Sequence, residues 1–192
     1  MRKLKVIQVG ICHEHANGKY RALKKLPDIF DVVGVVDERS FCHTPRYREH
    51  LFILEQERVL TLDEALHHPG LDAVLIEVPN LDLVPVAMEF ARRRIPMHVD
   101  KTCGETVQPY QELLALCESE NLPFQMGYVF RNNRAFRFVI EACRAGLLGD
   151  IFDIECDMNH CYGADDYQQY IGKFKGGIIF NLGSHLIDII TM

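Results

Sequence analysis

Short apolar runs alternate with amphipathic stretches through the first two thirds of the chain, a pattern typical of buried strands that alternate with helices. We expect strands at residues 5–9, 30–36, 59–60, 73–78, 97–99 and 124–126, and helices at 15–26, 44–57, 83–93 and 106–121. Thr61, followed by Glu64 three residues later, predicts a further helix that begins with a capping box. Apolar strands separated by helices indicate a parallel sheet covered on both faces. The pattern therefore predicts an α/β fold with a doubly wound, Rossmann-type sheet.

The pattern changes after residue 126. Residues 133–144 are expected to form a helix, and residues 151–158 alternate apolar and polar positions as a strand with one buried face does. A polar loop with tyrosines precedes an apolar helix at 178–190. One strand, one loop and two helices cannot bury both faces of a sheet. We therefore expect a dinucleotide-binding domain over residues 1–125 and an incomplete α+β domain over residues 126–192.

Composition and charge narrow the classes of partner. The 192 residues include 21 Lys and Arg against 27 Asp and Glu, which gives a formal net charge of -6. A mildly acidic chain has no general electrostatic attraction to nucleic acid or to anionic membranes. The 7 cysteines form no CxxC pair and are irregularly spaced, which favours reduced thiols in a cytoplasmic protein. No apolar run has the length of a membrane span, and whether the chain forms a homo-oligomer stays open.

The first predicted strand runs directly into the turn Gly10-Ile11-Cys12-His13. The dinucleotide fingerprint places glycine at the first, third and sixth positions of such a turn. Here only Gly10 is present, because Cys12 and His15 occupy the other two positions. Backbone amides and the positive end of the following helix can still hold a pyrophosphate. We expect Gly10, Ile11, Cys12 and His13 to contact a cofactor, and a tight turn without a ligand is the alternative.

Asp37 ends the second predicted strand, where a carboxylate accepts hydrogen bonds from the adenine ribose. A carboxylate at this position repels a 2′-phosphate, so the sequence favours NAD over NADP as cofactor. Arg39, two residues later, could weaken that preference, and a simple turn at the strand end is the alternative reading of Asp37.

Histidines and cysteines gather after the same two strands, at Cys12, His13, His15, Cys42 and His43. Their spacing matches no common zinc pattern, and we expect no metal.

Three segments resemble the Gfo/Idh/MocA family of oxidoreductases. VPN at 78–80 and HVDKT at 98–102 are similar to the stretch that leads to the family's Glu-Lys-Pro signature. Residues 127–133 and 146–151 resemble the linker into the family's second domain. GGIIFNLGSHLID at 176–188 is similar to the family's Gly-Gly…Asp-x-Gly-x-His-x-x-Asp segment. The segments follow the family's order along the whole chain, whereas family members are longer.

The resemblance implies hydride transfer between a nicotinamide and a hydroxyl-bearing carbon of a sugar, a cyclitol or a related polyhydroxylated small molecule. It places Pro79 and Asn80 at the cofactor, and Lys101 beside the nicotinamide or the substrate hydroxyl. His185 becomes the general base, since imidazole titrates near neutral pH. Asn181 becomes its neighbour, because positions four apart share a helix face.

Two departures from the family pattern matter. Asn181 replaces an Asp, and a neutral amide cannot stabilise an imidazolium by charge; Asp188 could substitute. Asp100 and Thr102 replace the Glu and Pro of the signature. A cis bond before a residue other than proline costs about 3–4 kcal/mol, so we expect a trans bond before Thr102. The alternative functions are a dinucleotide-binding protein without turnover and a fragment of a longer gene.

The tyrosines of the polar loop, Tyr162, Tyr167 and Tyr170, either contact substrate or belong to a solvated loop.

Overall fold

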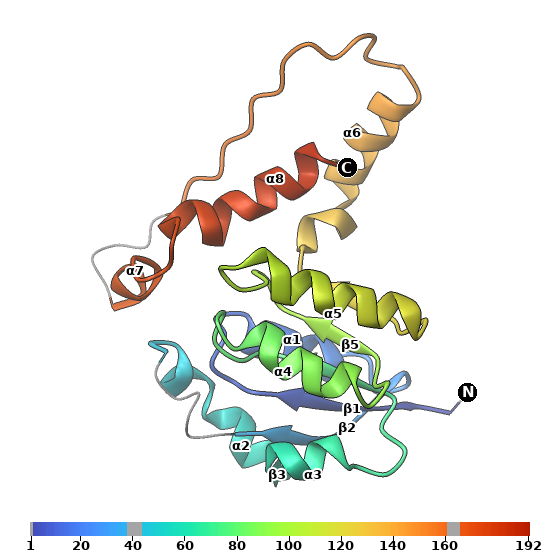
Figure 1. Ribbon diagram of the computed structural model, residues 1–192, viewed down its shortest axis with the longest axis vertical. Coiled ribbons are helices and arrows are strands. Elements are labelled where there is room, and N and C mark those ends of the chain that lie inside the picture. Colours follow the sequence, from blue (N-terminus) through green and yellow to red (C-terminus); the bar gives the residue numbers. More distant parts are fainter. Residues whose placement is uncertain (1, 38–43, 161–165) are drawn as a thin grey trace. The chain divides into compact units, whose positions relative to one another are not determined.

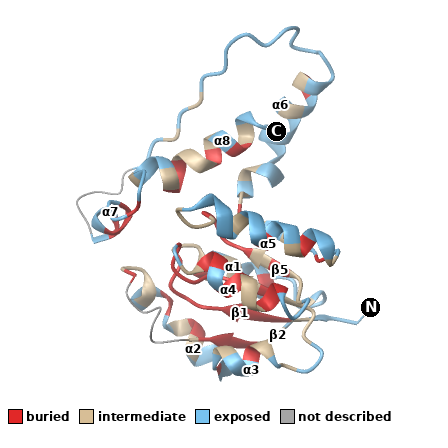
Figure 2. Cartoon of the chain, in the orientation of Figure 1, coloured by how far each residue is buried: buried red, intermediate tan, exposed pale blue. Residues whose placement is uncertain are grey.

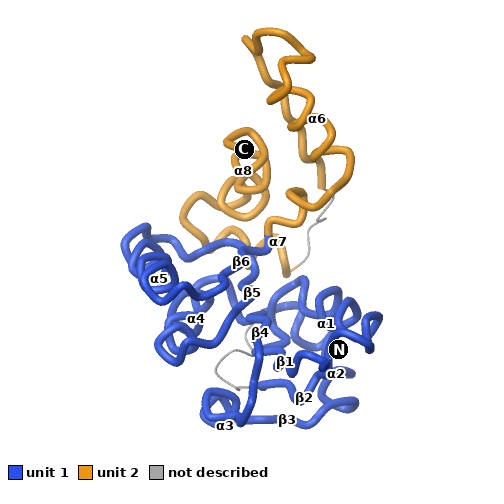
Figure 3. The backbone as a smooth tube through the Cα atoms, turned by 90° about the vertical axis from the view of Figure 1, so that its right-hand side faces the viewer, with its two compact units in different colours: residues 1–127 blue, residues 128–192 orange. Residues whose placement is uncertain are grey.

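The computed structural model describes residues 2–37, 44–160 and 166–192. The chain divides into two compact units, residues 1–127 (unit 1) and 128–192 (unit 2), which Figure 3 shows in two colours. Each unit is described by itself. Within the described ranges, no helix has the length and hydropathy needed to cross a membrane.

Unit 1 is built on a six-stranded sheet in the order β3-β2-β1-β4-β5-β6 (Figure 1). Every neighbouring pair of strands is parallel. This order is that of the doubly wound dinucleotide-binding fold, and the predicted fold class is confirmed. The strands are β1 (Leu4–Val9), β2 (Phe30–Val36), β3 (Val59–Leu60), β4 (Ala73–Ile76), β5 (Met97–Val99) and β6 (Phe124–Met126).

Helices cover both faces of this sheet. They are α1 (Ala16–Lys24), α2 (Phe52–Gln56), α3 (Leu62–Leu66), α4 (Leu83–Ala91) and α5 (Val107–Ser119). Val35 and Val36 are neighbours on β2 but belong to two different buried clusters, because successive strand residues face opposite sides. The larger cluster lies under α4 and α5 and includes Phe90 and Leu113. Figure 2 shows that burial is concentrated in the strands and in the inner faces of these helices.

Two local predictions for unit 1 have different outcomes. The capping box of α3 is confirmed: the Thr61 side chain accepts a hydrogen bond from the Glu64 amide, and the Glu64 carboxylate accepts one from the Thr61 amide. The single helix over residues 44–57 is wrong, because a 3-10 turn (Tyr47–His50) precedes α2. The His50 ring contacts the carbonyl oxygen of Ile11 at 2.8 Å, which ties this turn to the end of β1.

Unit 2 contains helices joined by extended chain. Its elements are a 3-10 turn (Val129–Asn132), α6 (Arg134–Arg144), α7 (Asp166–Ile171), a π-helical turn (Ile179–Gly183) and α8 (Ser184–Ile190). The predicted strand at 151–158 is wrong. A strand needs a neighbour for its backbone groups, and the described part of unit 2 contains no other strand. The segment is largely exposed, and the side chain of Phe152 is 98% exposed.

The loop before the last helix also differs from its prediction. Residues 166–171 of this loop form α7, and Tyr167 and Tyr170 are buried in a small aromatic cluster with Phe174, so they do not belong to a solvated loop. Tyr162 lies outside the described residues. The predicted apolar helix over 178–190 is present, with its first half wound as the π-helical turn.

Candidate functional site

The turn between β1 and α1 is held tightly against the end of β4. Gly10 has a φ of +89°, and a Cβ there would lie 2.8 Å from a methyl carbon of Val78. The position therefore requires glycine. The backbone amides of Cys12 and His13 donate hydrogen bonds to the carbonyl oxygen of Glu77, at 3.1 and 2.9 Å. Two of the amides expected to face a cofactor are thus satisfied within the protein.

The two non-glycine side chains of the fingerprint make contacts inside the protein. Cys12 is buried and packs in the larger hydrophobic cluster. His15 precedes the first residue of α1, and its Nδ1 atom lies 3.0 and 3.2 Å from the two carboxylate oxygens of Asp100. Local sequence patterns do not predict this contact, because the partners are 85 residues apart.

His13 is buried between the ends of three strands. Its Nε2 atom lies 3.0 Å from the carbonyl oxygen of Lys101, which also accepts a 2.9 Å hydrogen bond from the Asn80 side chain. Its Nδ1 atom lies 3.2 Å from Asp100. The structure therefore brings three predicted residues together: His13, Asn80 and Lys101.

The peptide bond between Lys101 and Thr102 is cis, so the expectation of a trans bond is wrong. The contacts of Asn80 and His13 with the Lys101 carbonyl oxygen hold the peptide in this orientation. The Lys101 side chain is buried, and its Nζ atom lies 3.4 Å from Glu14.

Two buried carboxyl groups, Glu77 and Asp100, lie beside these histidines. Burial and the charge of Asp100 raise the pKa of Glu77 well above its usual value. Burial alone would raise the pKa of Asp100, but its contacts with His13 and His15 outweigh that effect and hold it well below the usual value. Glu77 is therefore the carboxyl group that holds a proton more readily.

Asp37 follows β2 at the same edge of the sheet. Its Oδ2 atom accepts a 3.0 Å hydrogen bond from the Tyr47 hydroxyl. Its Oδ1 atom is buried and has no hydrogen-bond partner among the described residues. A buried acceptor without a donor is costly, so this atom suits a hydroxyl donor from a ligand. Arg39, Cys42 and His43 lie outside the described residues.

The residues predicted for acid-base chemistry lie in unit 2. Asn181 and His185 are both buried; the Asn181 amide contacts the Tyr167 hydroxyl at 3.3 Å. The His185 ring packs against Phe130, with ring centroids 5.0 Å apart. The Arg131 guanidinium donates to Asp188 from two nitrogens: the Nε hydrogen is shared by the two carboxylate oxygens at 2.9 and 3.0 Å, and Nη2 donates to Oδ1 at 2.5 Å. This ion pair gives Asp188 a cationic partner other than His185.

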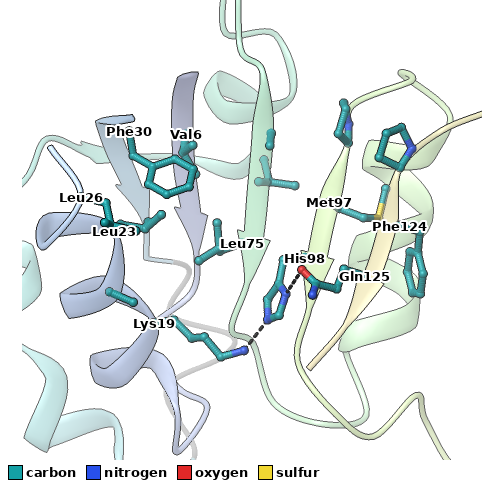
Figure 4. A pocket seen from close by; sticks show the side chains of 15 residues that line it. Val6, Lys19, Leu23, Leu26, Phe30, Leu75, Met97, His98, Phe124 and Gln125 are labelled. Atoms are coloured by element: carbon teal, nitrogen blue, oxygen red, sulfur yellow. Dashed lines mark hydrogen bonds between the residues drawn. The ribbon is translucent and has the colours of Figure 1, made fainter. Parts of the chain in front are cut away.

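A mostly apolar pocket of about 480 Å³ lies beside α1, over β1, β4, β5 and β6 (Figure 4). Lys19 donates a hydrogen bond to Nε2 of His98, and the other ring nitrogen lies 3.3 Å from the Gln125 side chain. Burial, followed by the charge of Lys19, lowers the pKa of His98 to about 4. The sequence did not reveal this pair, because the two residues are 79 positions apart.

Comparison with known proteins gives one curated relative and many similar structures. No family model matches the chain. The rhizopine catabolism protein MocA of Rhizobium meliloti is 26% identical over 129 residues, which cover 67% of this chain and 39% of MocA. The chain thus spans well under half of that relative.

Solved structures cover nearly the whole chain. An NAD-binding protein from Listeria innocua has a TM-score of 0.78 at 19% identity, with 98% of this chain and 54% of that protein aligned. The scyllo-inositol dehydrogenase of Lactobacillus casei, solved with NAD(H) and scyllo-inositol, has a TM-score of 0.77 at 16% identity, with coverages of 98% and 55%. The fold is confirmed by these structures, and the predicted resemblance to the Gfo/Idh/MocA family by MocA.

Proposed function

We propose that this relative of MocA is the cofactor-binding part, with the start of the catalytic part, of an NAD-dependent oxidoreductase. Its substrate class is a cyclitol or a related polyhydroxylated small molecule. The observation that carries the proposal is Asp37, at the end of β2 in a sheet of dinucleotide-binding order. One of its buried carboxylate oxygens has no donor among the residues that the structure describes. The inositol dehydrogenases among the similar structures support the substrate class.

The cofactor preference follows from charge. The Oδ1 atom of Asp37 accepts a hydrogen bond from the adenine ribose of NAD, whereas the 2′-phosphate of NADP is repelled by the same carboxylate. Gly10 lets the backbone approach a ligand closely. Because the amides of Cys12 and His13 donate to Glu77, the positive end of α1 is the feature of this turn that favours a diphosphate.

The bound nicotinamide supplies or accepts the hydride. Lys101 orients the substrate hydroxyl, and its contact with Glu14 limits the directions in which its ammonium group can point. His185 takes the hydroxyl proton as general base. Asn181 is neutral and its amide faces Tyr167, while Asp188 pairs with Arg131, so the imidazolium formed at His185 gains less charge stabilisation than an Asp at position 181 would provide.

A second function is a dinucleotide-binding protein without turnover. Two observations favour it. The backbone amides of Cys12 and His13 already donate to the Glu77 carbonyl oxygen, and position 181 carries an asparagine side chain where the family pattern has a carboxylate. The two functions share the cofactor site and differ only in the hydride transfer.

The test is calorimetric titration of the protein with NAD and with NADP. Asp37→Asn removes the charge that favours the ribose, so NAD should bind about 10–100-fold more weakly, the loss expected for one hydrogen bond to a charged group. NADP should lose less. Asp31→Asn changes an exposed carboxylate on the same strand and should leave both affinities unchanged. Equal losses for both cofactors would remove Asp37 from this role.

NADH formation from a panel of inositols then separates the two functions. Asn181→Asp should raise turnover and shift the pH-rate profile if His185 is the base. NAD binding without turnover in either protein would favour the second function.

A further inference from the structure

Four side chains from the ends of three strands converge in unit 1: His13 and His15 after β1, Glu77 after β4, and Asp100 after β5. We call them the His–Asp cluster. Although the spacing of the histidines in the sequence led us to expect no metal, we propose that this cluster binds a divalent transition-metal ion of the zinc type, with His13, His15 and Asp100 as ligands. The inference goes beyond the proposed oxidoreductase and does not depend on it.

The geometry of the three ligands fits such an ion. The Oδ2 atom of Asp100 lies 3.2 Å from Nδ1 of His13 and 3.0 Å from Nδ1 of His15. One ligand atom from each residue lies within 4.8 Å of the others. In a tetrahedral zinc site, bonds of about 2.0–2.2 Å place neighbouring ligand atoms about 3.3 Å apart. The ligand atoms need only small movements to reach that arrangement.

The outer contacts of His13 orient its ring for coordination. Nε2 faces the Lys101 carbonyl oxygen at 3.0 Å, so this nitrogen carries a proton. Nδ1 faces Asp100, and its lone pair binds an ion once Nδ1 is deprotonated. A metal-bound histidine commonly donates its second N–H to a carbonyl in this way. The backbone amide of His15 is 3.3 Å from Nδ1 of His13, a long hydrogen bond that coordination would replace.

Glu77 supplies an independent indication that the cluster accommodates a cation. Its side chain is fully buried and its Oε2 atom lies 3.8 Å from Nδ1 of His13. In the described ranges no N–H or hydroxyl group donates to its carboxyl oxygens, and its hydrogen-bond contact is with the Asp100 carboxyl group. Without an ion the pair avoids two buried negative charges because Glu77 holds a proton, whereas a dication at the cluster would let both carboxyl groups ionise. The Lys19 ammonium lies 3.9 Å from Asp100, so a dication would provide compensation that this contact gives only in part.

The ligand set and the exposure of the cluster select the class of ion. Imidazole suits zinc, cobalt and nickel, whereas magnesium and calcium prefer oxygen ligands throughout. The His15 side chain is 36% exposed while the Asp100 side chain is buried, so His15 forms the open side of the cluster. An ion here would join the β1–α1 turn to the residue before Lys101.

The experiment is a titration of metal-free, untagged protein with Zn²⁺, with Co²⁺ as spectroscopic probe. We expect one ion per chain, a rise in melting temperature and the absorption bands of four-coordinate Co²⁺. A ligand that binds only the native state raises its stability by mass action. His15→Ala removes a half-exposed ligand and should weaken binding by about 10–100-fold or more, because changes to an outer contact alone cost that much.

His67→Ala is the matched control, since His67 is an exposed histidine 3.2 Å from an Asp63 carboxylate oxygen outside the cluster. It should bind Zn²⁺ as the unchanged protein does. Glu77→Gln, which keeps the shape and removes the charge, should weaken binding less than His15→Ala. The proposal is overturned if no saturable binding of one ion is found, or if His15→Ala, folded by circular dichroism, binds as tightly as the control. NAD binding is measured separately, so failure here leaves the proposed oxidoreductase untouched.

Discussion

The two units of this chain place their large apolar side chains differently. In unit 1 the side chains of Phe90, Ile76 and Leu113 are completely buried between the sheet and its helices. In unit 2 the side chains of Phe138 and Phe152 are 72% and 98% exposed, and the buried cluster consists of four residues of α7 and the turn after it. A sheet paired along its whole width gives helices a surface to cover, and unit 2 has no such surface among its described residues. Hydrophobic burial therefore stabilises unit 1 far more than unit 2.

The largest expected effect tests this difference directly. Phe90→Ala should lower the free energy of unfolding of unit 1 by about 3–5 kcal/mol, because it leaves a cavity in a close-packed core. Phe138→Ala, in α6 of unit 2, should change stability by less than about 0.5 kcal/mol, since the side chain is mostly in solvent. Urea denaturation followed by circular dichroism measures both.

Both variants replace a phenylalanine with alanine, and the two original side chains differ in how far they are buried. A loss in Phe138→Ala comparable to that in Phe90→Ala would mean that the α6 face is covered in the folded protein, and the comparison between the units would fail.

The fold of unit 1 could be predicted because its signals are local. The apolar runs, the capping box at Thr61 and the strand-ending Asp37 each depend on residues close in sequence. The strand predicted at 151–158 fails for the opposite reason. Its alternation is correct for a strand, but pairing depends on a neighbour that the pattern cannot supply.

A second test concerns acid stability in unit 1. Burial lowers the pKa of His98 to about 4 in the folded state, while an unfolded histidine titrates near 6.5. Between these values the unfolded state binds more protons, so stability present above about pH 6.5 is lost as the pH falls towards 4. We expect a loss of about 2 kcal/mol from this residue, after allowing for partial exposure.

His98→Gln should remove that part of the acid loss, measured as the difference between the two proteins in urea denaturation at pH 7.5 and 4.5. His50, whose pKa burial also lowers, is present in both proteins and cancels in the difference. In hydrogen exchange read by mass spectrometry, peptides of unit 2 should exchange at the same rate in both proteins. A different rate there would mean that His98 also affects the stability of unit 2.

The candidate site contains residues that the sequence identifies and contacts that it does not predict. Their positions at the ends of predicted strands identified Gly10 and Asp37, and the family resemblance identified Lys101. Sequence reasoning could not predict that Asp100 contacts His15, or that Arg131 pairs with Asp188, because these residues meet only in the folded chain. His15, at the last glycine position of the fingerprint, is in the structure a partner of the buried Asp100 carboxylate.

The smallest expected effects come from matched helix caps, one in each unit. Thr61 caps α3 in unit 1, and the Asn133 side chain accepts hydrogen bonds from the Ala135 and Phe136 amides at the start of α6 in unit 2. Replacing either residue with alanine should cost about 1 kcal/mol, the usual loss for a helix cap.

If burial stabilises only unit 1 strongly, Asn133→Ala should speed amide exchange in α6 and leave the sheet unaffected, because local opening of α6 does not need the core of unit 1. Thr61→Ala should lower the urea midpoint of unit 1 without changing exchange in α6. Hydrogen exchange read by mass spectrometry resolves the two regions, and an Asn133→Ala protein whose sheet exchanges faster would show that both units unfold as one.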